Sequence, residues 1–284
     1  MPPTDTDTDT APDTDADTNT GTDPHAHTGA GADAVGDTDA RTGTGTGAGG
    51  DDRNPAWVLL SGASLVVLDF DKIVCDLFVR SPADRIAERL RELAGSDACH
   101  GAGATGLADP LVVFTRIHAT YRHTAPGLVT AVKERLDAEE VAAAESAARM
   151  PGAAALMEEL TGLGKEMAVV SNNCELAVQT FLKRHDLEKH ITAGVVGRPD
   201  APELMKPDPF GLLHVLHGSG VRPVDSVMVG DSRADAGAAQ RVGMPFLGVH
   251  PDEGRWRRPE PVEVAHAVPD MTSLLPDFVA ARRV

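Results

Sequence analysis

Residues 65–71, LVVLDFD, contain the feature that decides the fold, an apolar run of strand length that ends in two carboxylates. A nearly unbroken series of branched aliphatic side chains is typical of a strand that is buried on both faces of a parallel sheet. Similar apolar runs recur at residues 167–170, 227–229 and 246–249. We therefore predict parallel strands at these four places.

Segments with helical periodicity separate these runs. Their apolar residues recur at intervals near 3.6, which places them on one face of a helix. These residues are Leu156, Met157 and Leu160; Ala177, Val178, Phe181 and Leu182; and Leu212, Leu213 and Leu216. Alternating strands and helices predict an α/β fold, a Rossmann-like parallel sheet with helices on both faces, because parallel neighbours require a crossover connection. Ligands of such sheets bind beyond the carboxyl ends of the strands, so the polar residues there are the candidates for function.

One long stretch after the first strand shows helical patterns and no strand. Its candidate helices are residues 82–93, 109–121, 126–136 and 138–149, and the first three have a proline suited to a first turn. We expect these helices to form a cap at residues 80–149. The cap would be inserted into an α/β core formed by residues 55–79 and 150–284.

Residues 1–54 form a separate segment, built almost wholly from Asp, Thr, Gly, Ala and Pro. Such a composition cannot bury enough apolar surface to offset the loss of conformational entropy, so we expect a disordered acidic tail. Residues 1–52 hold twelve aspartates and one arginine, a net −11 of the chain's −17. Nucleic acid and anionic membrane surfaces repel a polyanionic segment, and we expect neither as a partner.

The start of the chain and its cysteines predict a cytoplasmic protein. The first residues, MPPTDTDTDT, have neither the basic start nor the apolar stretch of a secretory signal. No apolar run reaches membrane-spanning length. Cys75, Cys99 and Cys174 have no spacing typical of disulfide or metal sites, and we expect reduced thiols.

Two carboxylates, Asp69 and Asp71, lie where the first predicted strand ends. Their spacing brings both side chains out on the same side of the chain. Neighbouring acids repel each other unless a cation or a shared proton relieves the repulsion, so the pair favours a bound metal ion. A solvated turn would explain the pair equally well if it stood alone.

Polar residues also follow the second strand. Ser171 and Asn172 come directly after it and offer a hydroxyl and an amide to an oxyanion, although both residue types are common there simply as helix caps. Lys206 precedes Pro207 at the mouth of a predicted helix. A lysine held near several carboxylates suits a phosphate or carboxylate ligand, whereas most surface lysines are only solvated.

A second acidic motif, GDSRAD at residues 230–235, follows the third strand. Gly230 allows the backbone to approach a ligand closely. Asp231 and Asp235 are four residues apart, which predicts that both carboxylates lie on one side of a first helical turn. The helix dipole favours an acid there, but it explains one aspartate and not the whole motif.

In order and spacing these four motifs resemble the signature of the haloacid dehalogenase-like superfamily, over roughly residues 64–250. The inserted helices are similar to the helical cap of its phosphoglycolate phosphatase and β-phosphoglucomutase branches. The resemblance implies a magnesium-dependent phosphoric monoester hydrolase that acts on a small phosphorylated metabolite beneath the cap. It leaves open which metabolite this is, the oligomeric state and the role of the tail.

The resemblance also implies roles for the polar residues. Asp69 would be the nucleophile that forms an aspartyl-phosphate, and Asp71 would protonate the leaving group and then activate water. Ser171 and Lys206 would hold the transferring phosphoryl oxygens and neutralise the developing charge, with Asn172 beside them as a further substrate-binding residue.

A Mg²⁺ ion is the cofactor that the resemblance implies. It would be held by Asp69, the backbone carbonyl of Asp71, and Asp231. Asp235 would be a further ligand or the residue that orients Lys206.

Several cations in or next to the predicted cap are candidates for contacts with an anionic substrate. They are Arg80, Arg85, Arg116, His118, Arg122 and His123. A solvated helix face explains most of them equally well.

Two positions depart from the family pattern, which usually has Gly and then Thr after the second aspartate. This chain has Lys72 and Ile73. The first change restricts the backbone and adds a cation, and the second removes a hydroxyl. These departures leave open a catalytically weakened relative that binds a phospho-ligand or a protein. A phosphomutase also stays open, because it would have the same core residues. A dehalogenase is less favoured, because Asp71 and Asp231 are retained.

Overall fold

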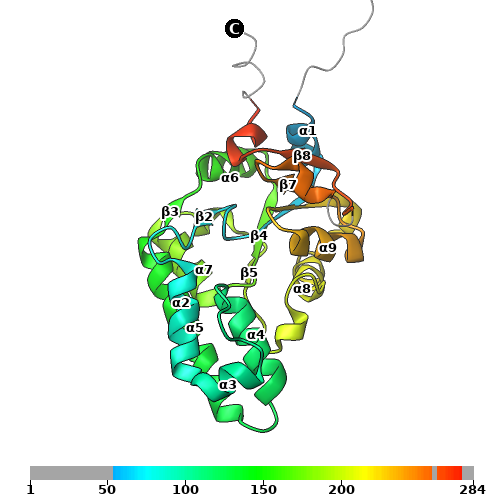
Figure 1. Ribbon diagram of the computed structural model, residues 1–284. Coiled ribbons are helices and arrows are strands. Elements are labelled where there is room, and N and C mark those ends of the chain that lie inside the picture. Colours follow the sequence, from blue (N-terminus) through cyan, green and yellow to red (C-terminus); the bar gives the residue numbers. More distant parts are fainter. Residues whose placement is uncertain (1–53, 258–260, 277–284) are drawn as a thin grey trace, which may run out of the picture. The chain divides into compact units, whose positions relative to one another are not determined.

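Six parallel strands form the sheet at the centre of the computed structural model (Figure 1). The structure describes residues 54–257 and 261–276. The strands are β1 (Leu65–Leu68), β4 (Glu166–Val170), β5 (Val195–Val196), β6 (Ser226–Gly230), β7 (Phe246–Val249) and β8 (His266–Val268). Neighbours follow the order β5-β4-β1-β6-β7-β8, so β1, which carries the first acidic motif, lies inside the sheet.

This sheet confirms the predicted α/β fold and its four strands. The two additional strands, β5 and β8, are only two and three residues long, so they leave no recognisable apolar run in the sequence. Residues 1–53 of the predicted tail lie outside the described residues. The predicted tail includes Asn54, which is buried and caps helix α1 (Pro55–Gly62), so Asn54 is part of the folded chain.

Helices cover both faces of the sheet. Alternate residues of β1 point to opposite faces, so they pack against both layers of helices. Val66 and Leu68 belong to one hydrophobic cluster, and Leu65 and Val67 belong to another. The first cluster includes residues of α1, α6 (Ala153–Gly162) and α7 (Glu175–Arg184), and the second includes residues of α8 (Phe210–Ser219) and α9 (Arg233–Val242). A β1 strand buried from both sides explains its unbroken apolar sequence.

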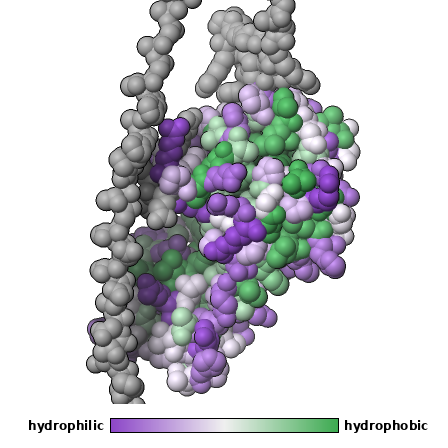
Figure 2. All heavy atoms as spheres, turned by 90° about the vertical axis from the view of Figure 1, so that its right-hand side faces the viewer, coloured by the Kyte–Doolittle hydropathy of each residue, from purple (hydrophilic) through white to green (hydrophobic). Residues whose placement is uncertain are grey.

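Helix α8 corrects one part of the predicted core. Leu212 is fully buried and Leu216 is nearly so, but Leu213 is 51% exposed, so the prediction that these three residues share one face of the helix is wrong for Leu213. Leu212, Val215 and Leu216 follow the i, i+3, i+4 spacing of a single face, and Leu213 points about 100° away from Leu212. Figure 2 shows the side of the molecule on which α8 and α9 lie in Figure 1, with hydrophilic and hydrophobic residues interspersed.

Four helices form a group of their own in the lower part of Figure 1. They are α2 (Ala83–Ala94), α3 (Ser96–Gly101), α4 (Pro110–Tyr121) and α5 (Pro126–Ser146). Their buried side chains, among them Ile86, Leu90 and Phe114, make a third hydrophobic cluster. The division of the chain into a core and a cap stays a prediction, but the inserted helices do have apolar packing of their own.

The end of this helical segment differs from the prediction. The two helices expected at residues 126–136 and 138–149 are one continuous helix, α5, because neither proline nor glycine interrupts the chain after Gly127. Residues 148–149 are a strand instead of a helix end. There β3 (Ala148–Arg149) pairs antiparallel with β2 (Cys75–Asp76), so the chain leaves the sheet and returns to it through adjacent segments.

Short 3₁₀ helices complete the described structure. They are η1 (Glu188–His190), η2 (Pro202–Leu204), η3 (Pro223–Asp225), η4 (Glu253–Trp256) and η5 (Met271–Leu274). Within residues 54–257 and 261–276, no helix has both the length and the hydropathy needed to cross a membrane.

The neighbours Leu212 and Leu213 provide a matched test of the packing on α8. We expect Leu212→Ala to lower the free energy of unfolding by about 3 kcal/mol, because it removes buried methyl groups and leaves a cavity. Leu213→Ala should change it by less than about 0.5 kcal/mol, since this side chain is half exposed. Urea unfolding of both variants measures the difference, and equal losses would contradict the packing described.

Candidate active site

The loops that follow β1, β4 and β6 border a cavity of about 640 Å³. Residues of α4 and α5, together with Phe78 and Ala83, form its opposite wall. All seven predicted site residues line this cavity: Asp69, Asp71, Ser171, Asn172, Lys206, Asp231 and Asp235. The parallel sheet brings them together because the carboxyl ends of its strands meet at one edge.

Lys206 lies at the centre of this group, and its ammonium is almost completely buried. Its Nζ is 2.6 Å from Asp69 Oδ1 and 2.6 Å from Asp235 Oδ1, and it donates a hydrogen bond of 2.7 Å to the backbone carbonyl of Val170. Burial alone would lower the pKa of Lys206, but the two carboxylates outweigh it and raise the pKa. The ammonium is therefore a fixed positive charge beside Asp69.

Asp69 is held at the end of β1 in a strongly acidic environment. Burial, with a further contribution from the charge of Asp235, raises the pKa of Asp69 to about 8, while Lys206 opposes this rise. The carboxylate needs cations around it to stay ionised near neutral pH. Lys206 is one such cation, and the neighbouring acids form a place for another.

Asp71 points to the same cavity but has different partners. Its Oδ1 accepts a hydrogen bond of 2.8 Å from the backbone N–H of Leu77. Burial raises the pKa of Asp71 above its ordinary value, although the Leu77 hydrogen bond and nearby Lys72 oppose the shift. A raised pKa makes this carboxyl more suitable than an ordinary surface aspartate to donate a proton.

The second acidic motif is arranged differently from the prediction. Asp231 precedes α9 instead of standing in its first turn, and Asp235 forms a capping box with Ser232 at the start of that helix. Gly230 is needed because a Cβ there would lie 2.6 Å from Asp235 Oδ2. The two aspartates still meet, because the chain turns between the end of β6 and α9.

Three carboxylates offer oxygen atoms that fit a divalent cation. One oxygen each from Asp69, Asp231 and Asp235 lies within 4.8 Å of the other two. Within the described part of the chain, no hydrogen bond or ion pair engages the carboxylate of Asp231, and burial and Asp235 raise its pKa to about 6. Carboxylate oxygens of this kind suit Mg²⁺. Asp235 is already used by Lys206 and Ser232, which favours its role in orienting Lys206.

The residues after β4 position the site in two ways. Ser171 is buried, and its Oγ lies 3.1 Å from Asn173 Oδ1. Asn172 accepts a hydrogen bond from the backbone N–H of Lys206 at 2.9 Å and donates one to its carbonyl at 3.0 Å. The Asn172 amide thus fixes the backbone of Lys206, a contact that the sequence analysis does not predict.

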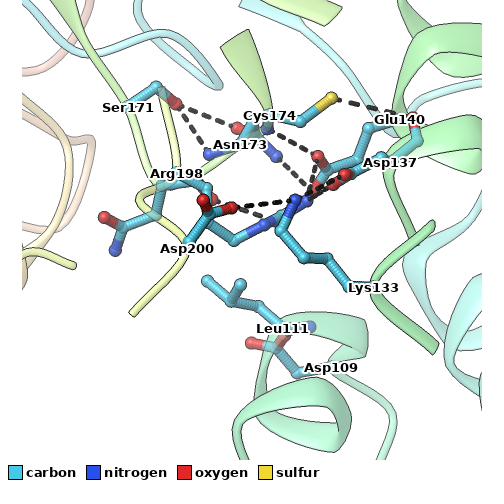
Figure 3. A network of polar contacts seen from close by, with 11 residues as sticks. Asp109, Leu111, Lys133, Asp137, Glu140, Ser171, Asn173, Cys174, Arg198 and Asp200 are labelled. Carbon is cyan, nitrogen blue, oxygen red and sulfur yellow. Dashed lines mark hydrogen bonds and ion pairs between the residues drawn. The ribbon is translucent and has the colours of Figure 1, made fainter. Parts of the chain in front are cut away.

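Beside Ser171 lies an ion-pair network that no sequence pattern predicted (Figure 3). Arg198, in the loop after β5, donates hydrogen bonds of 2.9 Å to both carboxylate oxygens of Glu140 on α5. Glu140 also accepts hydrogen bonds from the side chain of Asn173 and the backbone N–H of Cys174. Neither charged residue follows an apolar strand run, so no local pattern indicates their pairing. The network joins α5 to the loop that carries Ser171.

The same network includes a second cluster of side chains of the types that bind metal ions. Asp137, Glu140 and Cys174 also lie close enough together to share an ion. However, the guanidinium of Arg198 bonds to both carboxylates and supplies the positive charge. Burial raises the pKa of the Cys174 thiol to about 12, so it is protonated at neutral pH. This cluster is therefore a buried ion pair and not a metal site.

Lys72 and Ile73, the two departures from the family pattern, have different surroundings. Lys72 adopts a left-handed backbone conformation with φ of 66°, a region that favours glycine, and its ammonium pairs with Asp76. Ile73 is completely buried in the core and does not line the cavity. Lys72 does line the cavity.

The six cations proposed for the cap side do not line the cavity. Arg85, for example, is exposed and pairs with Glu88 on the surface of α2. Among the described residues, the cations that line the cavity are Lys72 and Lys206.

Part of the chain is similar to a known family of hydrolases. Residues 115–249, slightly less than half of the chain, match the family model described as haloacid dehalogenase-like hydrolase. A phosphoglycolate phosphatase of Pseudomonas putida is 31% identical over 126 residues, 44% of this chain and 46% of that protein. The aligned part of the chain thus spans about half the length of this curated relative.

Solved structures show the same fold. A haloacid dehalogenase-like hydrolase from Bacteroides fragilis has a TM-score of 0.57 at 19% identity, covering 75% of this chain and all of the other. The β-phosphoglucomutase of Clostridium difficile has a TM-score of 0.56 at 14% identity, covering 78% and 96%. The chain is therefore an α/β protein with an acidic site at the carboxyl edge of its sheet. Its fold and its matched residues 115–249 are similar to those of the haloacid dehalogenase-like hydrolases.

The left-handed conformation of Lys72 gives a stability test. We expect Lys72→Gly to be more stable than Lys72→Ala by about 1 kcal/mol, because only glycine adopts this φ without strain. Both variants lose the ion pair with Asp76, so their difference isolates the backbone effect. Thermal unfolding should place the melting temperature of the glycine variant about 3 °C higher. Equal melting temperatures would show that the backbone relaxes at no cost.

Adjacent glutamates on α5 test the buried ion pair. Glu140→Ala should lower the free energy of unfolding by about 4 kcal/mol, since it leaves the buried guanidinium of Arg198 without its main partner. Glu139→Ala removes more exposed pairs with Arg89 and Arg135 and should cost about 1 kcal/mol or less for each. Urea unfolding of both variants checks this order, and a similar cost for both would contradict it.

Proposed function

We propose that this chain is a magnesium-dependent phosphatase that hydrolyses a small phosphorylated metabolite through an aspartyl-phosphate. The observation that carries the proposal is the Asp69 carboxylate, held 2.6 Å from the buried ammonium of Lys206 at the edge of a cavity. Asp71 lies beside the same cavity, two residues along the chain. The phosphoglycolate phosphatases among the relatives support a phosphate ester as substrate.

In the first half-reaction, a carboxylate oxygen of Asp69 attacks the phosphorus of the substrate. The bond between phosphorus and the leaving oxygen breaks, and Asp71 donates a proton to that oxygen, which releases the alcohol. Burial of Asp71 favours its protonated form and so supports this role.

The second half-reaction reverses the proton transfer. Asp71, now ionised, accepts a proton from water, and the water oxygen attacks the phosphorus of the aspartyl-phosphate. The acyl phosphate bond breaks, inorganic phosphate leaves, and the Asp69 carboxylate is restored. Transfer of the phosphoryl group to water, and not to a second sugar hydroxyl, distinguishes this reaction from that of a mutase.

Lys206 and Ser171 hold the transferring group. The ammonium of Lys206 places a positive charge next to Asp69, where negative charge develops on the phosphoryl oxygens. The buried hydroxyl of Ser171 lies on the same cavity. Asn172 and Asp235 keep Lys206 in place by bonding to its backbone and to its ammonium.

Asp69 and Asp231, with Asp235 close by, are the residues that would hold Mg²⁺. When bound, the ion would neutralise carboxylate and phosphate charge and so let the two approach each other. Its positive charge would also lower the raised pKa of Asp69.

Replacement of the nucleophile tests the proposal. With Mg²⁺ and an aryl phosphate, we expect Asp69→Asn to lower kcat by more than about 1,000-fold, because the amide cannot form the acyl phosphate. Chelation of the metal should abolish the wild-type activity. Asp225→Asn is the matched control, since Asp225 precedes β6 at the opposite edge of the sheet and does not line the cavity.

Release of phosphate by wild type and Asp69→Asn at the same slow rate would refute the proposed mechanism. The catalytically weakened relative would then be the better interpretation.

A further inference from the structure

We infer that the alcohol part of the substrate carries no negative charge and is bound mainly through apolar contact. This inference rests on the proposed phosphatase function and narrows its substrate class. It comes from the wall of the cavity that faces the acidic site, where a leaving group would lie.

That wall is largely apolar. It is formed by Phe78, Ala83, Ala108, Pro110 and Leu111, with the acids Asp109 and Glu140 beside them. None of these side chains can form an ion pair or a hydrogen bond with a carboxylate or a second phosphate on the substrate. An anionic group placed against them would lose water without gaining a partner.

Two helices begin at this wall, α2 at Ala83 and α4 at Pro110, and the first N–H groups of a helix ordinarily attract anions because they have no partner within it. At α2 the negative charge of Asp84 in the first turn opposes an anion. At α4 the N–H groups are already used. The carboxylate of Asp109 accepts hydrogen bonds from the N–H groups of Leu111 at 2.8 Å and Val112 at 3.2 Å, and Pro110 has no N–H. Figure 3 shows Asp109 and Leu111 together at this helix start. A second anion would be repelled by Asp109.

The positive charges near the cavity are also committed to partners. Lys206 is bonded to Asp69, Asp235 and a carbonyl. Lys72 pairs with Asp76. Arg198 is held by Glu140 and Asp137 and does not line the cavity. Within the described residues, each cation that lines the cavity therefore already has an acidic partner.

This arrangement predicts discrimination against phosphoglycolate, although relatives of this chain are phosphoglycolate phosphatases. The glycolate carboxylate would lie near the apolar wall and Asp109. An ethyl group would fit the wall without an electrostatic penalty, and an ethylammonium group would be attracted by Asp109.

Three phosphate esters with two-carbon alcohols test the inference: phosphoglycolate, ethyl phosphate and ethanolamine phosphate. They differ mainly in the charge of the alcohol part, which is negative, neutral and positive. With Mg²⁺ present, we expect kcat/KM for phosphoglycolate to be at least about tenfold below that for ethyl phosphate. The value for ethanolamine phosphate should equal or exceed that for ethyl phosphate.

The variant Asp109→Asn removes the negative charge and keeps a good helix cap, since Asn caps as well as Asp. It should raise the ratio of kcat/KM for phosphoglycolate to that for ethyl phosphate by about threefold to tenfold. Leu111→Arg, which adds a cation to the wall, should raise the same ratio further. Ethyl phosphate is the internal reference that separates charge preference from a general loss of activity.

The outcomes that contradict the inference can be told apart from those that contradict the proposed function. A wild-type kcat/KM for phosphoglycolate equal to or above that for ethyl phosphate would overturn this inference and leave the phosphatase proposal intact. An unchanged ratio in both variants would also overturn it, because the wall would then not set the preference. Hydrolysis of none of these esters, nor of an aryl phosphate, would overturn the proposed function and this inference with it.

Discussion

The rest of the site depends on one buried ammonium. Lys206 is surrounded by Asp69, Asp235 and the carbonyl of Val170, so its three N–H bonds reach residues at or after β1, β4 and β6. A buried charge is tolerated only when it is paired and hydrogen-bonded. This requirement constrains the three strand ends to meet at one point. The acids that gather there are mutually repulsive, and Lys206 offsets part of that repulsion.

The sequence predicted those parts of the molecule that depend on local patterns. Four strands and the polar residues at their ends could be located because a strand buried on both faces needs an unbroken apolar run, and its last residue leaves the sheet. The meeting of Asp69, Ser171, Lys206 and Asp231 then follows from the topology of a parallel sheet. Their chemical roles stay predictions.

Other features depend on contacts between distant residues, which no local pattern shows. Arg198 and Glu140 are 58 positions apart, and each would pass for an ordinary surface charge in the sequence. The exposure of Leu213 could be judged only once the side of α8 that meets the sheet was known. The order of helix and strand near residue 148 was also missed, since a two-residue strand has no sequence signature.

Helix α5 belongs to two hydrophobic clusters at once. Val132 and Leu136 pack among the inserted helices, and Ala143 and Ala144 pack in the cluster on one face of the sheet. Because α5 packs in both clusters, disruption of either cluster also destabilises the other. Melting of the α2–α5 segment and of the sheet should therefore occur as a single cooperative event, with one calorimetric peak in place of two.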